Sequence, residues 1–364
     1  MSVKKRLQDV FEQTGSLRRA IVSILLAMVI GALIVYLQGD NPLVAYTALF
    51  RSAFGSRASV FQTLANSTPL IVTGIAAAIT FRTGVVNLGV EGQLYMGGLA
   101  AALVGVYLEG VPSFLHVFLA LLAGCVVSFI WAAPFQWLRV QFGANELVTT
   151  TLSNYVAILL TTYLVAYPFM KPGAPLAMTK NVLPSAYLPR LVSQGRLNLG
   201  FIIGAVLCVF VWYVINRSSL GFEFRMIGAN KRFSHYVGIR VKRMQVLAMG
   251  LSGAAAGLAG AIEVLGTQHR FIQNISPGYG WVGVLVALMA SNNPIAVLPV
   301  GILFGALKTG GLGMEAATNV PSELSDVLQA IIILFFAANV VFPSLRKESV
   351  LKKKHAEIAH PEQV

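Results

Sequence analysis

Residues 81–105 read FRTGVVNLGVEGQLYMGGLAAALVG, and this stretch carries the strongest signal for the architecture. Glycines at 84, 89, 92, 97 and 98 and the polar Asn87, Glu91 and Gln93 interrupt apolar runs. A glycine-broken helix with polar side chains is tolerated at membrane depth where protein buries it or where it lines a wet cavity. A tight helix crossing explains the glycines, but a carboxylate at mid-span costs about 2.5–3.5 kcal/mol. Glu91 escapes that cost if the segment is a cytoplasmic turn.

The composition points to a membrane protein. Of 364 residues, 56% are hydrophobic and 11% are charged, and a soluble protein has about twice that charged share. The net charge of +13 would suit a nucleic-acid binder, but the basic residues gather on one side of the predicted membrane, so we exclude that class. Cys125 and Cys208 each lie inside an apolar run, which excludes a disulfide framework and a cysteine-rich metal site.

The apolar runs predict an all-α, polytopic integral membrane protein with about ten transmembrane helices, some of them glycine-broken or re-entrant. Ser291, Asn292 and Asn293 separate two short runs, which we interpret as half-spans or a re-entrant hairpin. The predicted spans are 20–37, 60–80, 94–108, 114–138, 147–167, 199–215, 244–265, 278–290, 294–307 and 324–342.

The distribution of basic residues orients these spans. Ten spans place both termini on one side, and most Lys and Arg residues then face the cytoplasm, as the positive-inside rule requires. The predicted organisation is a cytoplasmic basic N-terminus (1–19), a membrane domain (20–342) and a cytoplasmic tail (343–364). Within the membrane domain we expect a stiff, proline-rich extracytoplasmic loop at 168–198 and a cytoplasmic loop at 216–243. Lys308 is left at the end of a predicted span.

The inner loop reads SLGFEFRMIGANKRFSHYVGIRVKR over residues 219–243. The pattern of residues 222–236 in this loop predicts a short amphipathic helix. Its apolar members are Phe224, Ile227 and Phe233. Such a loop can lie against anionic lipid headgroups through its basic charge. Alternatively, an apolar face between glycines can seat in the groove of a partner protein.

Residues 143–157, GANELVTTTLSNYVA, carry a polar stripe at helical spacing. Glu146, Thr149, Thr150 and Ser153 form the stripe, and Asn154 lies beside it. Thr and Ser often bond to the backbone of their own helix, so packing is the default interpretation. The sharper alternative is a stripe that lines a solute pathway.

Residues 251–266, LSGAAAGLAGAIEVLG, are almost all small. Gly253, Gly257 and Gly260 predict a face for close helix packing. Tyr279 and Trp281 follow among further glycines. Aromatic rings in this setting either anchor a helix at the membrane interface or stack on a flat ligand.

No catalytic motif is visible in the sequence. It contains no GxxxxGK[ST] phosphate loop, no HExxH and no GxSxG, and its five histidines are scattered among different segments. We therefore expect no enzymatic activity, no bound cofactor and no metal site. If the chain moves a solute by ATP-driven transport, another polypeptide must hydrolyse the ATP.

Five stretches together resemble the permease subunits of ABC importers for branched-chain amino acids, ribose and simple sugars, above all the bacterial nucleoside (guanosine-type) permeases. The resemblance covers about residues 41–342. The signature of the wider importer group is only partly present. Gly228 matches its glycine, but no I-x-L-P follows Gly238. The five stretches are FRTGVVNLGVEGQLYMGG, NELVTTTLSNYVA, GFEFRMIGANKRFSHYVGI, LSGAAAGLAGAIEVLG and GYGWVGVLVALMASNNP.

The resemblance implies a bacterial inner membrane protein with three partner proteins. These are a cytoplasmic ABC ATPase that binds ATP and magnesium, a second homologous permease and an extracytoplasmic solute-binding protein. It also implies that residues 221–238 couple the chain to the ATPase. The residues expected in that contact are Gly221, Phe222, Glu223, Arg225, Gly228, Asn230, Phe233, Tyr236 and Gly238.

The polar and aromatic positions supply candidates for contact with the solute. We expect Tyr279 or Trp281 to stack on a purine and Asn87, Glu91 and Asn154 to bond the ribose or the base. The full set of candidate pathway residues is Asn87, Glu91, Gln93, Glu146, Thr150, Asn154, Tyr279 and Trp281.

Two alternatives stay open at this point. The solute of an ABC importer could be a sugar or a branched-chain amino acid in place of a nucleoside. The chain could also be a proton-coupled secondary transporter, with Glu91, Glu146 and Glu263 as its relay. That alternative leaves the basic inner loop without a role.

Overall fold

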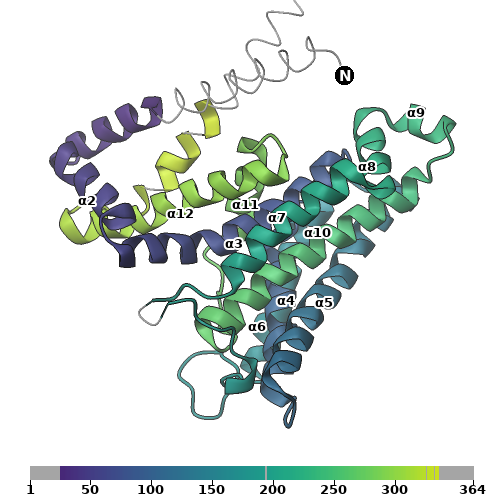
Figure 1. Cartoon of the computed structure of the whole chain (residues 1–364), viewed down its shortest axis with the longest axis horizontal. Helices are drawn as coiled ribbons and strands as arrows, with labels where there is room; N and C mark the ends of the chain where they lie inside the picture. The colour runs from purple at the N-terminus through teal and green to yellow at the C-terminus, as the bar shows by residue number, and fades with distance from the viewer. Residues whose placement is uncertain (1–24, 193–194, 325, 332, 336–364) are drawn as a thin grey trace, which may run out of the picture. The chain divides into compact units, whose positions relative to one another are not determined.

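The computed structural model describes residues 25–192, 195–324, 326–331 and 333–335, and these residues fold as helices joined by turns and loops (Figure 1). The described part contains no β-strand, only isolated bridges, so the all-α prediction is confirmed for it. The main helices are α2 (Pro42–Phe54), α3 (Arg57–Arg82), α4 (Val90–Tyr107), α5 (Ser113–Phe142), α6 (Glu146–Ala166), α7 (Gly200–Arg217), α8 (Ser219–Ala229), α9 (Lys231–Tyr236), α10 (Val241–Glu263), α11 (Tyr279–Met289) and α12 (Pro294–Ala317). Shorter elements are the 3₁₀ turn η1 (Pro184–Ala186), the π-helical turn η2 (Val264–Gln268) and apolar helices at Leu25–Leu37 and Asp326–Phe335.

The chain divides into two compact units, residues 53–309 and residues 1–52 with 310–364. In the smaller unit a set of apolar side chains forms its own core. The Tyr46 hydroxyl donates to the Met28 carbonyl oxygen at 2.6 Å within this unit. The core residues are Val35, Ala45, Leu49, Met314, Val320, Leu324 and Leu328.

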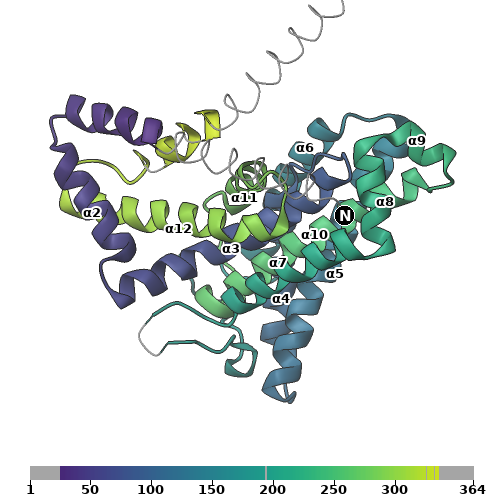
Figure 2. The same cartoon turned by 45° about the horizontal axis from the view of Figure 1, so that its top comes forward.

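In the larger unit, α10 packs against α3, α4 and α5, and Figures 1 and 2 both show α4, α5 and α10 side by side. The predicted small-residue face makes this contact. A Cβ on Gly257 would overlap Ser128 of α5, and a Cβ on Gly97 would overlap the backbone of Gly257. Gly260 lies equally close to the Leu94 carbonyl oxygen of α4. Glycine is therefore required where α10 meets both neighbours.

Six helices of the described residues are long and apolar enough to cross a membrane: α3, α5, α6, α7, α10 with η2, and α12. The chain is thus a multi-pass helical membrane protein. Helix α4 has 18 residues and is buried on most of its surface. Helix α11 has only 11 residues, which span about 16 Å and cannot cross a hydrocarbon core of about 30 Å. This length agrees with a half-span at 278–290, one of the two arrangements predicted for this region.

Other predicted spans differ from the structure. The span placed at 294–307 was too short, because α12 continues to Ala317 and carries Lys308 inside the helix. The prediction ended at a charged residue, but the apolar pattern resumes beyond it. Helix α2 was not predicted. The spans at 20–37 and 324–342 lie only partly within the described residues, and both termini lie outside them.

The segment between α6 and α7 is irregular, as its prolines predict. His269 stacks on Tyr187 with ring centroids 3.9 Å apart, and burial together with the nearby charge of Arg190 lowers the pKa of His269. Backbone hydrogen bonds tie the segment to the ends of α4 and α10. These include Leu183 N to Gly105 O (2.8 Å), Leu188 N to Leu265 O (3.0 Å) and Thr179 N to Phe271 O (2.9 Å).

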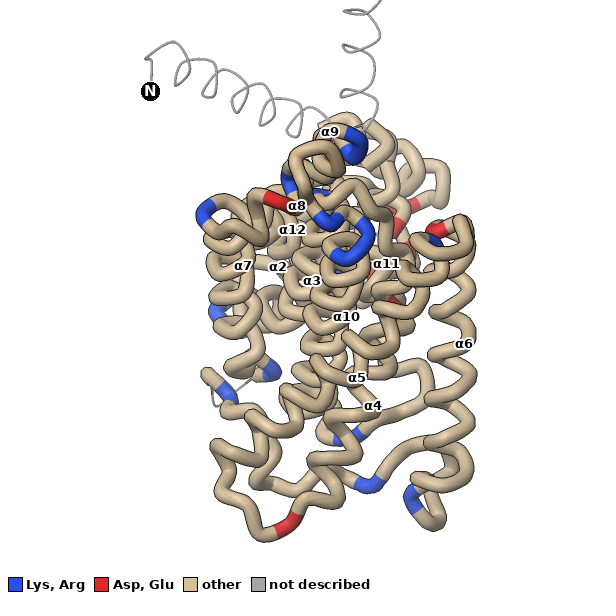
Figure 3. The backbone as a smooth tube through the Cα atoms, turned by 90° about the vertical axis from the view of Figure 1, so that its right-hand side faces the viewer, with Lys and Arg blue, Asp and Glu red and all other residues tan. Residues whose placement is uncertain are grey.

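Charged residues gather at two ends of the larger unit (Figure 3). One end, which we call the α8 end, carries α8 and α9 with their lysines and arginines. The opposite end, which we call the far end, carries the segment between α6 and α7. The tubes of α5 and α6 between these ends are almost free of charge, as expected of helices in hydrocarbon.

The glycine contact between α10 and its neighbours gives a stability prediction. Gly257→Ala should lower the stability of the purified protein by about 1–3 kcal/mol, the usual cost of overpacking, because the new methyl group meets Ser128. Gly195→Ala is the control, since no atom lies within 4 Å of its added Cβ. Thermal unfolding in detergent measures both, and equal midpoints would contradict the packing.

Candidate functional site

A buried polar network centred on Asn87 lies where the chain passes from α3 to α4. The Asn87 amide nitrogen donates to Gln93 Oε1 and to Ser252 Oγ, each at 2.9 Å. Its amide oxygen accepts from the Gly89 N–H at 2.8 Å. The Ser252 hydroxyl donates onward to the Ala76 carbonyl oxygen at 2.6 Å. The network therefore joins α3, α4 and α10 through one asparagine.

The polar stripe of α6 faces the start of α4. The Asn154 amide oxygen accepts from the Gly92 N–H at 2.8 Å, and its amide nitrogen donates to the Leu88 carbonyl oxygen at 2.7 Å. The Thr150 hydroxyl accepts from the Leu88 N–H at 3.3 Å. Asn154 and Thr150 are almost fully buried. These bonds favour the packing interpretation of the stripe over a pathway lining.

Glu91 caps the buried N-terminus of α11. Its Oε2 accepts from the Gly280 N–H at 2.6 Å, and the Ser276 hydroxyl accepts from the Tyr279 N–H at 2.9 Å. A Cβ on Gly280 would collide with the Glu91 backbone, so glycine permits the approach. The first N–H groups of a helix lack partners within the helix and attract negative charge. The N–H groups of this helix end thus supply hydrogen-bond partners to the buried Glu91 side chain.

Tyr279 and Trp281 lie in the first turn of the same half-helix. The Lys308 ammonium nitrogen lies 4.6 Å from the centre of the Tyr279 ring, a cation–π distance. Lys308 also interacts electrostatically with Glu91 and Glu263. Trp281 is 39% exposed, whereas Glu91 is 3% exposed. The predicted aromatic pair is therefore adjacent to the predicted carboxylate.

The structure separates Glu146 from this group. Glu146 pairs with Arg139 across the connection from α5 to α6. Glu263 is buried at the last turn of α10, where Gln268 Nε2 donates to it at 3.2 Å. Sequence reasoning gave Lys308 no role. Its position within an otherwise apolar run was the available signal, because a lone charge inside a span usually has a functional partner.

The inner loop forms two helices, so the prediction of one helix over 222–236 was wrong. Asn230 is extended (φ −157°, ψ 104°) and separates α8 from α9. Its side chain accepts from the Phe233 N–H at 3.0 Å and caps α9. Such a cap begins a new helix and stops the preceding one.

The apolar face of the loop also differs from the prediction. Phe224 and Ile227 are buried against the chain's own helices and are unavailable to a partner. The exposed aromatic side chains are Phe222 (51%), Phe233 (51%) and Tyr236 (87%). Helix α8 packs against α7 and α10, which buries Phe224 and Ile227. Sequence periodicity does not reveal that burial, so two of the three predicted apolar members are not exposed.

Helix α8 contacts the C-terminal end of α3 and the turn that follows it. A Cβ on Gly228 would overlap the Arg82 carbonyl oxygen, and Gly84, with φ of +67°, lies against Gly228. The Arg82 guanidinium donates to the Asn292 carbonyl oxygen at 2.8 Å in the turn between α11 and α12. Nearby, partial burial and the charge of Arg139 lower the pKa of Lys231. Helix α8 is therefore linked to the end of α3 and, through Arg82, to the turn between α11 and α12.

These features define a class of protein: a multi-pass membrane subunit with a polar interior, a half-span and a cytoplasm-type basic loop, as in transporters. The described residues contain no group of three or more His, Cys, Asp or Glu that could hold a metal ion. The chain belongs to the family of permease components of branched-chain amino acid transport systems, whose model matches residues 59–337.

Curated relatives support the resemblance seen in the sequence. The guanosine ABC transporter permease protein NupP of Bacillus subtilis is 36% identical over 92% of this chain and 97% of its own length. The nucleoside ABC transporter permease protein NupB of Lactococcus lactis is 31% identical over 92% and 95%. The glucose ABC transporter permease protein TsgB13 of Haloferax volcanii is 30% identical over 90% and 88%.

The contacts of Asn154 distinguish packing from solute contact. Asn154→Ala leaves the Gly92 N–H and the Leu88 carbonyl oxygen without their partner, and each buried unsatisfied group costs about 1–3 kcal/mol. We expect a lower thermal unfolding midpoint and an unchanged KM for solute uptake. Thr149→Ala is the control, because Thr149 bonds only to the start of its own helix. A raised KM with normal stability would return Asn154 to the pathway.

Proposed function

We propose that this chain is the permease subunit of an ABC importer that carries nucleosides across the bacterial inner membrane. The observation that carries the proposal is similarity along nearly the whole chain to guanosine and nucleoside permeases. The glucose permease is almost as similar, so the solute needs its own test. ATP and magnesium would bind to a partner ATPase, and this chain would have no enzymatic activity.

The ATPase would dock on the exposed aromatic side chains of α8 and α9. Phe222, Phe233 and Tyr236 project from two short helices at a basic end of the molecule. Exposed aromatic anchors of this kind dominate binding energy at protein interfaces. All three aromatic residues belong to the set within 221–238 that the resemblance implies for this contact, and their exposure supports the proposal.

The transport cycle would use the contacts behind α8. Closure of the paired ATPases on ATP would push α8 against Arg82 and Gly84. Arg82 holds the turn between α11 and α12 through Asn292, so α3 and the half-helix α11 would shift together. Rigid elements joined by few contacts transmit such movements. Alternating access would follow from that shift.

The remaining partners follow from the same proposal. A second homologous permease would complete the pathway, and an extracytoplasmic solute-binding protein would deliver the solute at the far end. The α8 end, both termini and the tail would then be cytoplasmic, and the segment 168–198 would be extracytoplasmic. The lipid bilayer surrounds the apolar faces.

The positions of the three acids argue against a proton relay. Glu146 pairs with Arg139, whereas Glu91 and Glu263 both interact with Lys308 in another part of the unit. A relay requires neighbouring proton-binding groups. The secondary-transport alternative therefore loses one of its three residues.

Reconstitution tests the solute and the energy source together. The complete transporter in proteoliposomes should take up radiolabelled guanosine only with ATP on the ATPase side. Excess unlabelled adenosine should compete, and glucose and leucine should not. Uptake that follows a pH gradient without ATP would refute ABC coupling. Competition by glucose alone would show that the solute is glucose and not a nucleoside.

The proposed ATPase contact at Phe222, Phe233 and Tyr236 can be tested by substitution. Phe233→Ala with Tyr236→Ala should weaken co-purification of the ATPase by about 30-fold, because loss of a binding hot spot costs 2 kcal/mol or more. Phe210→Ala is the control, since Phe210 is 60% exposed, a value between those of Phe233 and Tyr236, but lies on α7 rather than on α9. Unchanged ATPase recovery with the double variant would move the docking site elsewhere.

A further inference from the structure

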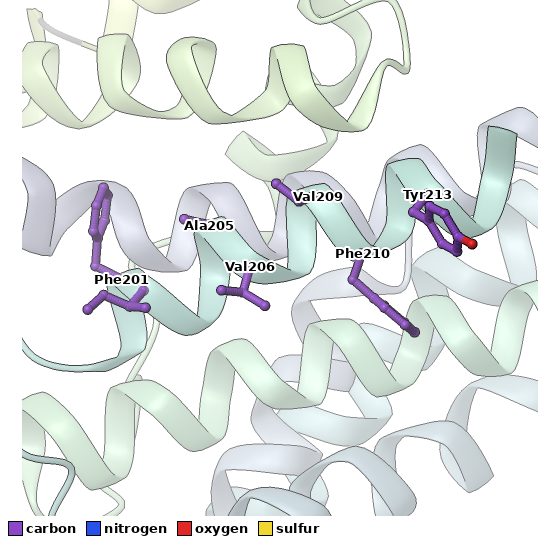
Figure 4. A pocket seen from close by; sticks show the side chains of 7 residues that line it. Phe201, Ala205, Val206, Val209, Phe210 and Tyr213 are labelled. Carbon is purple, nitrogen blue, oxygen red and sulfur yellow. The ribbon is translucent and has the colours of Figure 1, made fainter. Parts of the chain in front are cut away.

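The exposed face of α7 is entirely apolar. Val206, Val209, Phe210 and Tyr213 are 58–60% exposed along it, and Figure 4 shows their side chains lying along the helix beside Phe201. The only polar atom in this group is the hydroxyl of Tyr213, in the last turns of the helix. Such a face suits lipid chains, which offer no hydrogen bonds.

The faces of α3 and α12 differ from that of α7. Gln62, Asn66 and Lys308 are all partly exposed. Gln62 Nε2 donates to Asn66 Oδ1 at 3.2 Å, and Asn66 Nδ2 donates to Thr309 Oγ1 at 2.9 Å. These hydrogen bonds thus join polar side chains of α3 and α12 in a row, here called the ladder. Gln62, Asn66 and Lys308 are partly exposed along it.

The depth of this ladder follows from helix geometry. The hydrogen bond from Arg82 to the Asn292 carbonyl oxygen brings the inner ends of α3 and α12 to one level. At 1.5 Å per residue, Asn66 lies about 24 Å above Arg82 and Lys308 lies about 21 Å above the start of α12. Both positions fall within a hydrocarbon layer of about 30 Å. Partly exposed polar groups at this depth must face water or another protein chain.

Charged and aromatic side chains lie next to the ladder, toward the interior of the larger unit. Behind Lys308 lie the buried carboxylates of Glu91 and Glu263, with which it interacts. Below it lies the ring of Tyr279. Arg196, an exposed residue of the segment between α6 and α7, interacts with Glu263 and Tyr279. The series thus links the segment between α6 and α7 to Lys308 of α12.

We propose that Gln62, Asn66, Lys308 and Tyr279, here called the α3–α12 wall, are this chain's solute-contacting wall of the translocation pathway. The wall accepts an uncharged nucleoside. The Tyr279 ring, next to which Lys308 lies, stacks on the base, and Lys308 and Asn66 bond the ribose hydroxyls. The choice of nucleoside rests on the function proposed above, whereas the position of the wall does not.

The charges of the region explain the preference for an uncharged solute. Two carboxylates, Glu91 and Glu263, face two cations, Lys308 and Arg196. A balanced site neither traps nor repels a neutral molecule with many hydroxyl groups.

Cysteine accessibility tests the position of the wall. Asn66→Cys and Lys308→Cys are made with Cys125→Ala and Cys208→Ala, and the complete transporter is labelled in vesicles with a charged, impermeant methanethiosulfonate. Asn66→Cys should react at least tenfold faster than Val206→Cys, the lipid-facing control on α7. Guanosine with the binding protein should slow the reaction at Asn66→Cys severalfold. Equal rates at Asn66→Cys and Val206→Cys would overturn the proposal.

Uptake kinetics test the contacts without the cysteine-free background. Lys308→Gln and Tyr279→Leu should each raise the KM for guanosine by about tenfold, while co-purification of the ATPase stays normal. Tyr279→Phe should restore most of the affinity, because the ring can still stack. Val209→Ala, on the exposed apolar face of α7, is the control. Unchanged KM values in Lys308→Gln and Tyr279→Leu would refute the contacts.

The two proposals fail in different ways. If the wild-type transporter imports glucose or an amino acid instead of guanosine, the proposed function is wrong. The labelling of Asn66→Cys can then be repeated with that solute, and protection would keep the wall in place. If guanosine is imported but neither protects Asn66→Cys nor responds to Lys308→Gln, the wall alone is wrong.

Discussion

The hydrogen bond from the Gly280 N–H to Glu91 is the contact on which the interior of the larger unit depends. Helix α11 is a half-span, so its N-terminus ends inside protein at a depth where no bulk water can satisfy the first N–H groups. A carboxylate supplies both the acceptor and the negative charge that the helix dipole favours. Because Glu91 belongs to the first turn of α4, the same bond sets where α4 begins relative to α11.

The other polar contacts hold this arrangement in place. Asn87 and Asn154 bind the chain on either side of Glu91 to α10 and α6, and Lys308 interacts with Glu91 from α12. At the α8 end, Gly228 and Arg82 connect α8 to α3 and to the turn before α12. The half-helix is thus held by polar bonds at its N-terminus and by a hinge-like turn at its other end, an arrangement suited to movement between two states.

The sequence by itself determined the kind of protein and the composition of its interior. Low charge and long apolar runs require a helical membrane protein, because only helices and closed barrels satisfy backbone groups in lipid. The glycines of residues 251–266 predicted the close packing of α10, since only a missing side chain permits that approach. Asn87, Glu91, Gln93 and Asn154 were identified as unusual at membrane depth, and all four are buried in one polar region.

Only the tertiary structure decided which of these side chains bind protein and which stay accessible. Asn87 meets Ser252 across 165 residues of sequence, and no local pattern reveals that pairing. Periodicity counted Phe224 in an apolar face that was open to lipid or to a partner, but Phe224 is buried where α8 packs against α7 and α10. Charge ended a predicted span at Lys308, whereas carboxylates from α4 and α10 compensate that charge within a continuous helix. Burial depends on neighbours that are distant in sequence, and for this reason the accessible wall could be located only in three dimensions.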